Sequence, residues 1–146
     1  MVAITLPDGS VRNFHGPVTG AALAADIGPG LAKAALAIKV GGQLRDLSRS
    51  IEADANVEIV TRDHDDALEL LRHDAAHIFA EAVQELFPGT QITFGPAIED
   101  GFYYDFYREE PFTPDDFEAM EKRMQKIVDR DEKIIREIWD RDSAVK

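Results

Sequence analysis

Cysteine is absent from this sequence of 146 residues, and its absence excludes disulfides and thiolate metal sites. A reducing cytosol is then the simplest compartment, and we expect a cytoplasmic protein. Long apolar runs are also absent, so no segment is expected to span a bilayer and no membrane partner is predicted. The N-terminus, MVAITLPDGS, lacks the basic start and the apolar segment of a signal peptide, so no targeting peptide is expected.

Basic residues are scarce, and the resulting charge is unevenly distributed. The chain has 28 acidic and 16 basic residues, which gives a net charge of −12. Residues 1–62 hold six of each kind, so the whole imbalance lies in residues 63–146. This step in charge predicts two units with a boundary near residue 62. It also argues against general polyanion binding by the second unit, because nonspecific affinity for nucleic acid requires a basic surface.

The first unit has the pattern of a small α+β roll. Five segments are β-rich or alternate between apolar and polar residues, and we expect strands at 2–6, 10–15, 36–40, 43–47 and 56–61. Tight turns, PDG and GG, join the first two and the next two strands into hairpins. Thr19 is placed to cap a short helix between the hairpins, which GPG at 28–30 ends. Two hairpins, a helix and a closing strand are the elements of a β-grasp fold.

The second unit combines long helices with an aromatic hairpin. The segment 64–87 has no Gly or Pro and predicts a helix that the following PG ends. After it we expect a hairpin of residues 90–98 and 101–107, a helix over 113–131, a strand over 133–139 and a further helix starting near 140. Thr113 and Pro114 form a helix start, since Thr caps well and Pro fits the first helical position. The second unit is therefore also α+β.

Two of the four histidines lie four residues apart in the long helix, within HDAAH at 73–77. A helix advances about 100° per residue, so His73 and His77 share one face. That face lies roughly opposite to an apolar stripe, which is expected to face the core: Leu68, Leu71, Ala75, Phe79, Ala82 and Leu86. Ala76 and Ala80 keep the bulk low beside the imidazoles, and we expect this to leave room for a ligand.

The residues alone leave three interpretations of this pair open. It faces water on a polar helix face, or it is a satisfied polar pair inside a larger core, or it is a functional site. A shared zinc is disfavoured, because a catalytic zinc requires about three protein ligands and His15 and His64 lie far away or off this face. No metal is therefore predicted. Two imidazoles that titrate near neutral pH suit acid–base chemistry or substrate positioning.

Five motifs give the sequence a specific resemblance. In chain order they are LAIKVGGQLRDL, ANVEIVT, RHDAAHIFAEAV, GPAIEDGFYYDF and FTPDDFEAMEKRMQKIV. In this order and at this spacing, the chain resembles the N-terminal part of bacterial threonyl-tRNA synthetases over its whole length. The resemblance implies a TGS domain, a β-grasp module, at 1–62. It also implies the first part of a tRNA editing domain at 63–146.

The resemblance also implies a chemistry for the histidines. The parent enzyme ligates L-threonine to its tRNA using ATP, and its editing domain hydrolyses seryl-tRNA formed by mistake. A second site is useful because one methyl group gives only about 1–3 kcal/mol of discrimination. Carried over to this sequence, His73, His77 and Tyr104 line the deacylation pocket. The histidines would position water with help from a ribose hydroxyl, and Tyr104 would bind a hydroxyl. Gly95 and Asp105 belong to the same motif without an assigned role.

The sequence departs from the family pattern after Lys146. The family's editing pocket continues with a Cys-x-x-x-His pair and a lysine that are not in this sequence. Its catalytic core, with ATP, magnesium and a zinc, and its anticodon-binding domain are also not in it. We therefore expect the fragment to hold no cofactor, to be inactive alone and to be a monomer. The parent is expected to be a homodimer that binds tRNA.

Two alternatives of other classes follow from the same features. TGS units also occur in alarmone synthetase/hydrolases and in certain GTPases, where they are binding modules. The His-Asp dipeptides at 64–65 and 73–74 hint at such a metal phosphohydrolase, which would need further His and Asp ligands. The other alternative is a freestanding trans-editing deacylase, which would also need the Cys-x-x-x-His pair.

Overall fold

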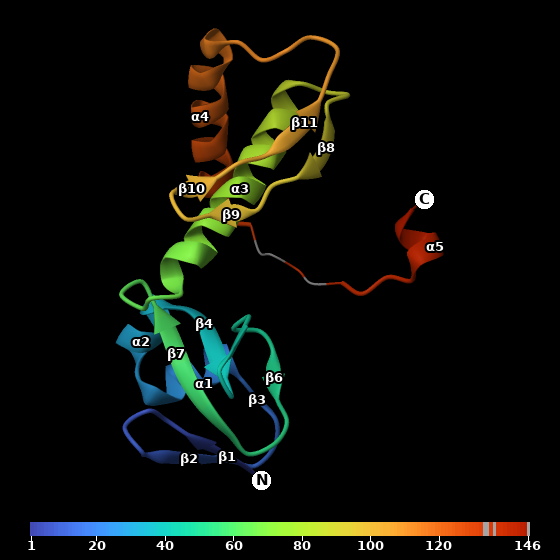
Figure 1. Ribbon diagram of the computed structural model, residues 1–146. Helices are drawn as coiled ribbons and strands as arrows, with labels where there is room; N and C mark the ends of the chain where they lie inside the picture. The colour runs from blue at the N-terminus through green and yellow to red at the C-terminus, as the bar shows by residue number, and fades with distance from the viewer. Residues whose placement is uncertain (133–134, 136, 146) are drawn as a thin grey trace. The chain divides into compact units, whose positions relative to one another are not determined.

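The computed structural model describes residues 1–132, 135 and 137–145, and Figure 1 shows their helices and strands. The chain forms two compact units, Met1–Arg72 and His73–Lys146, and the division falls inside helix α3 (Ala67–Leu86). The two units are described separately. No helix among the described residues is long and apolar enough to cross a membrane.

The first unit is built on a five-stranded mixed sheet in the order β2-β1-β7-β4-β5. Its strands are β1 (Val2–Thr5), β2 (Val11–Phe14), β4 (Ala35–Val40), β5 (Gln43–Arg45) and β7 (Ala55–Thr61). The hairpins β1–β2 and β4–β5 are antiparallel, as predicted. Strand β7 joins them, because it pairs in parallel with β1 and antiparallel with β4. This is the predicted β-grasp arrangement.

Local residue choices explain the turns and helices of this unit. Gly41 and Gly42 have φ angles of 55° and 81°, as a two-residue hairpin turn requires. The hydroxyl of Thr19 accepts a hydrogen bond of 3.2 Å from the Ala22 amide, which confirms the predicted cap of α1 (Gly20–Ile27). A six-residue helix, α2 (Pro29–Ala34), follows. Two short strands were not predicted: β3 (Val18–Thr19) pairs with β6 (Ser50–Ile51).

The core of the first unit lies between its sheet and α1. Its largest fully buried side chains come from three of the sheet strands and from α1: Ile4, Leu23, Ile38 and Val57. At the end of the sheet, Ala67 is buried against Ala37 and Val60, and Leu70 packs beside them. The first turn of α3 therefore belongs to a second, smaller apolar cluster of this unit, separate from the one that contains Leu23 of α1.

The second unit packs an interrupted hairpin and a helix against α3. Strand β8 (Gln91–Phe94) pairs with β11 (Asp105–Tyr107), and β9 (Ala97–Ile98) pairs with β10 (Gly101–Phe102), all antiparallel. The predicted hairpin is confirmed, but Gly95–Pro96 and Tyr103–Tyr104 interrupt its ladder. The interruptions include Gly95 and Tyr104, which belong to one of the motifs on which the resemblance rests.

Helix α4 (Pro114–Asp129) begins as the sequence predicts. The Asp116 carboxylate accepts a hydrogen bond of 2.8 Å from the Thr113 amide, and Pro114 occupies the first turn. The four-residue helix α5 (Arg141–Ala144) confirms the helix start expected near residue 140. Of the strand expected over 133–139, residues 133, 134 and 136 lie outside the described residues. The described positions 135 and 137–139 are not in a strand.

The apolar face predicted for α3 is wrong in part. Leu68 and Leu71 were expected in the core, but they are 54% and 44% exposed. The reason is that α3 contributes to two cores at different angles around its axis. Ala67 and Leu70 pack into the first unit, whereas residues of the second half are buried in the other: Ala76, Ala80, Ala82 and Val83. One continuous stripe therefore does not describe this helix.

Candidate functional site: a histidine pair and an aromatic hairpin

His73 and His77 form a hydrogen-bonded pair on the exposed surface of α3. Their Nε2 atoms lie 3.0 Å apart, and their rings meet edge to face with centroids 4.5 Å apart. Two ring nitrogens bond in this way only when one carries a proton and the other presents a lone pair. At least one imidazole is therefore neutral, and the bonded pair combines a proton donor with a proton acceptor.

The pair does not make a metal site by itself. Within the part of the chain that the structure describes, no group of three His, Cys, Asp or Glu side chains is placed to hold a metal ion. A zinc site of the usual kind requires at least one more protein ligand. The arrangement suits proton transfer or water positioning instead, since both can use a single hydrogen-bonded imidazole pair.

The space beside the imidazoles differs from the expectation. Ala76 and Ala80 were expected to leave room for a ligand, but they are only 1% and 4% exposed. Both alanines lie on the face of α3 that is buried within the second unit. Any ligand of His73 and His77 must therefore approach from another side of the pair, where Gln84, one to two turns further along the same face, is exposed.

Tyr104 lies between β10 and β11 and belongs to a cluster of aromatic rings. Its ring stacks on Phe106, with centroids 4.9 Å apart and planes 21° apart. Phe106 meets Phe79 and Phe112 edge to face at 5.5 Å and 5.7 Å. The Tyr104 ring also lies against Gly95, which has no side chain to displace it. The ring of Tyr104 is thus in contact with both Phe106 and Gly95.

The histidine pair and the aromatic cluster that includes Tyr104 lie at different angles around α3. The ring cluster contacts the helix at Phe79, two residues after His77, and two residues correspond to about 200° of rotation. Among the described residues, no hydrogen bond or ring contact joins Tyr104 to either histidine. The structure therefore pairs His73 with His77 but does not bring Tyr104 against them. Their membership of one pocket stays a prediction.

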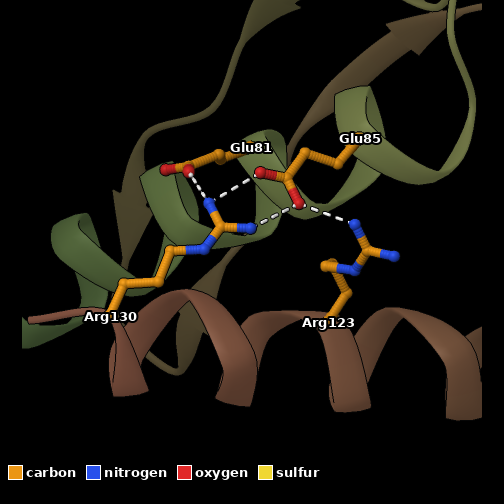
Figure 2. Close-up of polar contacts among 4 residues, drawn as sticks. All are labelled: Glu81, Glu85, Arg123 and Arg130. Carbon is orange, nitrogen blue, oxygen red and sulfur yellow. Dashed lines mark hydrogen bonds and ion pairs between the residues drawn. The ribbon is translucent and has the colours of Figure 1, made fainter. Parts of the chain in front are cut away.

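A network of charged residues that the sequence analysis did not identify fastens α4 to α3. Figure 2 shows Arg123 of α4 and Arg130, the residue directly after α4, directed at Glu81 and Glu85 of α3. Glu85 accepts hydrogen bonds of 2.7 and 2.8 Å from Arg130 and of 2.7 Å from Arg123, and Glu81 accepts one of 3.1 Å from Arg130.

This network changes the titration of Glu85. The hydrogen bonds from Arg130, then those from Arg123, stabilise the carboxylate and lower the pKa of Glu85 to about 2. The sequence does carry a signal for such pairing, because Glu81 and Glu85 are spaced i, i+4 and the two arginines i, i+7 on predicted helices. Glu81 lies one turn after His77, so the network also anchors α3 next to the histidine pair.

Comparison with known proteins identifies the first unit by class. Residues 2–61 match the TGS domain family, which agrees with the β-grasp sheet and its α+β composition. Residues 2–61 of the first unit therefore have the similarity to the TGS family that the resemblance implied.

Relatives extend this similarity through both units. The chain is 64% identical over 145 residues to the threonine–tRNA ligase of Rhodospirillum rubrum, which covers 99% of this chain and 23% of that protein. The threonine–tRNA ligases of Thiobacillus denitrificans and Acidiphilium cryptum are 66% and 62% identical over 146 residues, with 100% of this chain and 23% of each protein covered. The chain is thus similar over its whole length to part of bacterial threonine–tRNA ligases, and it spans less than a quarter of their length. These findings confirm the resemblance drawn from the five motifs.

Proposed function

We propose that this chain supplies the TGS domain and the first part of the editing domain of a threonine–tRNA ligase. The observation that carries the proposal is the identity of 62–66% to such ligases across 99–100% of the chain. A regulatory protein that shared only the TGS module would lose the similarity near residue 61, where the family match ends. The continuous similarity therefore favours the ligase over the alarmone hydrolase-like alternative.

The proposed reaction at the histidine pair is the hydrolysis of seryl-tRNA. Water attacks the ester carbonyl that joins serine to the ribose of the terminal adenosine. The ester C–O bond breaks, serine leaves as the acid, and the ribose oxygen regains a proton. In this scheme the neutral imidazole whose Nε2–H donates the hydrogen bond accepts a proton from the attacking water at its free Nδ1, because the lone pair of the other Nε2 is already used by that bond, and this proton then passes to the ribose oxygen. Its partner keeps that ring oriented through the 3.0 Å hydrogen bond.

Tyr104 has a separate role in this proposal. Its phenol binds a hydroxyl of the substrate. The packing of its ring against Phe106 supports that role, since a hydrogen-bonding group must be held in a fixed position to orient a substrate. Because no hydrogen bond or ring contact among the described residues joins Tyr104 to the histidines, the substrate rather than a direct contact would connect them. Residues beyond this chain would complete the pocket.

The proposed partner is tRNA, bound mainly by other parts of the parent protein. Residues 63–146 carry the whole net charge of −12, so this region is a poor general binder of RNA. ATP, magnesium and zinc would serve the ligation site of a cytoplasmic, homodimeric parent. A freestanding deacylase remains the second candidate, because it would use the same histidines without a ligation site.

The test is a double substitution in the full-length parent protein. His73→Ala combined with His77→Ala should slow hydrolysis of seryl-tRNA by about 10²–10⁴-fold, the usual contribution of positioned acid–base groups. Threonylation should remain nearly unchanged, and mischarged seryl-tRNA should accumulate with serine and ATP. Unchanged deacylation would contradict the proposal. A parallel fall in both activities would show that the pair is structural.

A further inference from the structure

Gly95 occupies a position where the structure leaves no space for a side chain. A Cβ atom added there would lie 2.0 Å from Cδ2 and 2.4 Å from Cε2 of Tyr104, whereas real Cβ contacts stay above 3.0 Å. Gly95 is not among the glycines with positive φ, so its backbone conformation is open to other residues. The requirement for glycine at this position is therefore steric.

The Tyr104 ring cannot move away from Gly95 without disturbing its neighbours. The ring stacks on Phe106, with centroids 4.9 Å apart, and it also lies against the Gly95 backbone. Phe106 is itself held edge to face by Phe79 and Phe112. A methyl group at position 95 would push the ring into this cluster, and close-packed rings resist such displacement.

The backbone around the two residues is fixed as well. Phe94, which precedes Gly95, is paired with Asp105, which follows Tyr104. The hydroxyl of Thr93 donates a hydrogen bond of 2.6 Å to the carbonyl of Asp105. The separation of Gly95 and Tyr104 is thus set by the β8–β11 ladder, and the hairpin cannot easily open to accept a side chain.

We propose that Gly95 is a positioning residue for Tyr104, and that its missing side chain forms the seat that directs the phenol toward the substrate. The functional part of this inference rests on the proposed role of Tyr104 in deacylation. The steric part stands on the geometry of the hairpin alone. Two experiments separate these parts.

The first experiment is a double-mutant cycle on the thermal stability of this chain. Gly95→Ala should lower Tm by at least about 4 °C, since overpacking is costly in a small domain. In a Tyr104→Ala background, which removes the ring, the same substitution should have little effect. Gly16→Ala is the matched control, because a Cβ there meets nothing within 4 Å. Equal effects of Gly95→Ala in both backgrounds would overturn the inference.

The second experiment measures deacylation of seryl-tRNA by the full-length parent. Tyr104→Phe, which removes only the hydroxyl, should lower kcat/KM by about tenfold, as expected for the loss of one hydrogen bond. Gly95→Ala should lower it at least as much, the two changes together should be no worse than Gly95→Ala alone, and threonylation should stay unchanged. Normal deacylation by Gly95→Ala beside a slow Tyr104→Phe would overturn the inference. If Tyr104→Phe is itself silent, the proposed role of Tyr104 is wrong, and the stability cycle alone decides whether Gly95 seats the ring.

Discussion

The Nε2 atoms of His73 and His77 are 3.0 Å apart, so one imidazole donates a hydrogen bond to the other across one turn of α3. This hydrogen bond makes the two residues a coupled pair rather than two independent side chains. A doubly protonated pair cannot form the hydrogen bond, because both Nε2 atoms would then be donors.

Single substitutions in the pair should therefore be strongly non-additive. In the full-length parent, His73→Ala and His77→Ala should each remove most of the deacylase activity. The double variant should be little slower than the slower single variant, as for catalytic groups that act together. The measurement is the rate of seryl-tRNA hydrolysis for all four proteins. Independent roles would instead give effects that multiply.

The arginine contacts of Glu85 predict a dependence of stability on pH. The pKa of this carboxyl falls from an ordinary 4.5 to about 2 in the folded protein. Because the folded-state pKa is the lower one, the stabilisation is fully present above about pH 4.5 and is lost as the pH falls toward 2. Glu85→Gln should lower the Tm of this chain at pH 6. The difference in Tm between the variant and the unsubstituted chain should shrink toward zero near pH 2.

The matched control for Glu85 is Glu121→Gln. Glu121 is an exposed residue of α4 with no ion pair among the described side chains. The substitution Glu121→Gln should change Tm little at any pH, since exposed carboxyls contribute little to stability. A Tm difference for Glu85→Gln that stays constant from pH 6 to pH 2 would show that the arginine contacts do not govern the titration of Glu85.

Features set by a few neighbouring residues could be predicted from the sequence. The Thr19 cap, the turn at Gly41–Gly42 and the start of α4 at Thr113 each depend on residues within one turn, and each was found as expected. The pairing of His73 with His77 also follows from spacing on one helix.

Features that depend on distant segments could not be predicted in this way. The face of α3 that is buried changes along the helix, because Ala67 packs into one core and Val83 into another. Periodicity assumes a single core and therefore placed Leu68 incorrectly inside. The contact of Gly95 with Tyr104 likewise depends on the register of β8 against β11, which the sequence does not determine.

Zinc should not bind tightly to the purified chain. Two nitrogens that share a tetrahedral zinc lie roughly 3.3 Å apart, so the metal would replace the hydrogen bond between His73 and His77 and still gain only two protein ligands. After dialysis against a chelator, metal analysis should find far less than one zinc per chain. His73→Ala should leave the residual zinc unchanged. One equivalent of zinc that survives dialysis would reveal a further ligand.

Limited proteolysis should locate the boundary between the two units. The step in net charge predicts a boundary near residue 62, whereas the compact first unit of the structure extends to Arg72. Arg62 is exposed and lies in the turn before α3, while Arg72 is partly buried within that helix. Because proteases require locally unfolded backbone, trypsin should cut after Arg62 first and release a stable β-grasp piece. Mass spectrometry identifies the cut, and Arg62→Gln should remove it. An early cut after Arg72 with none between residues 61 and 66 would place the boundary inside α3 and contradict the prediction from charge.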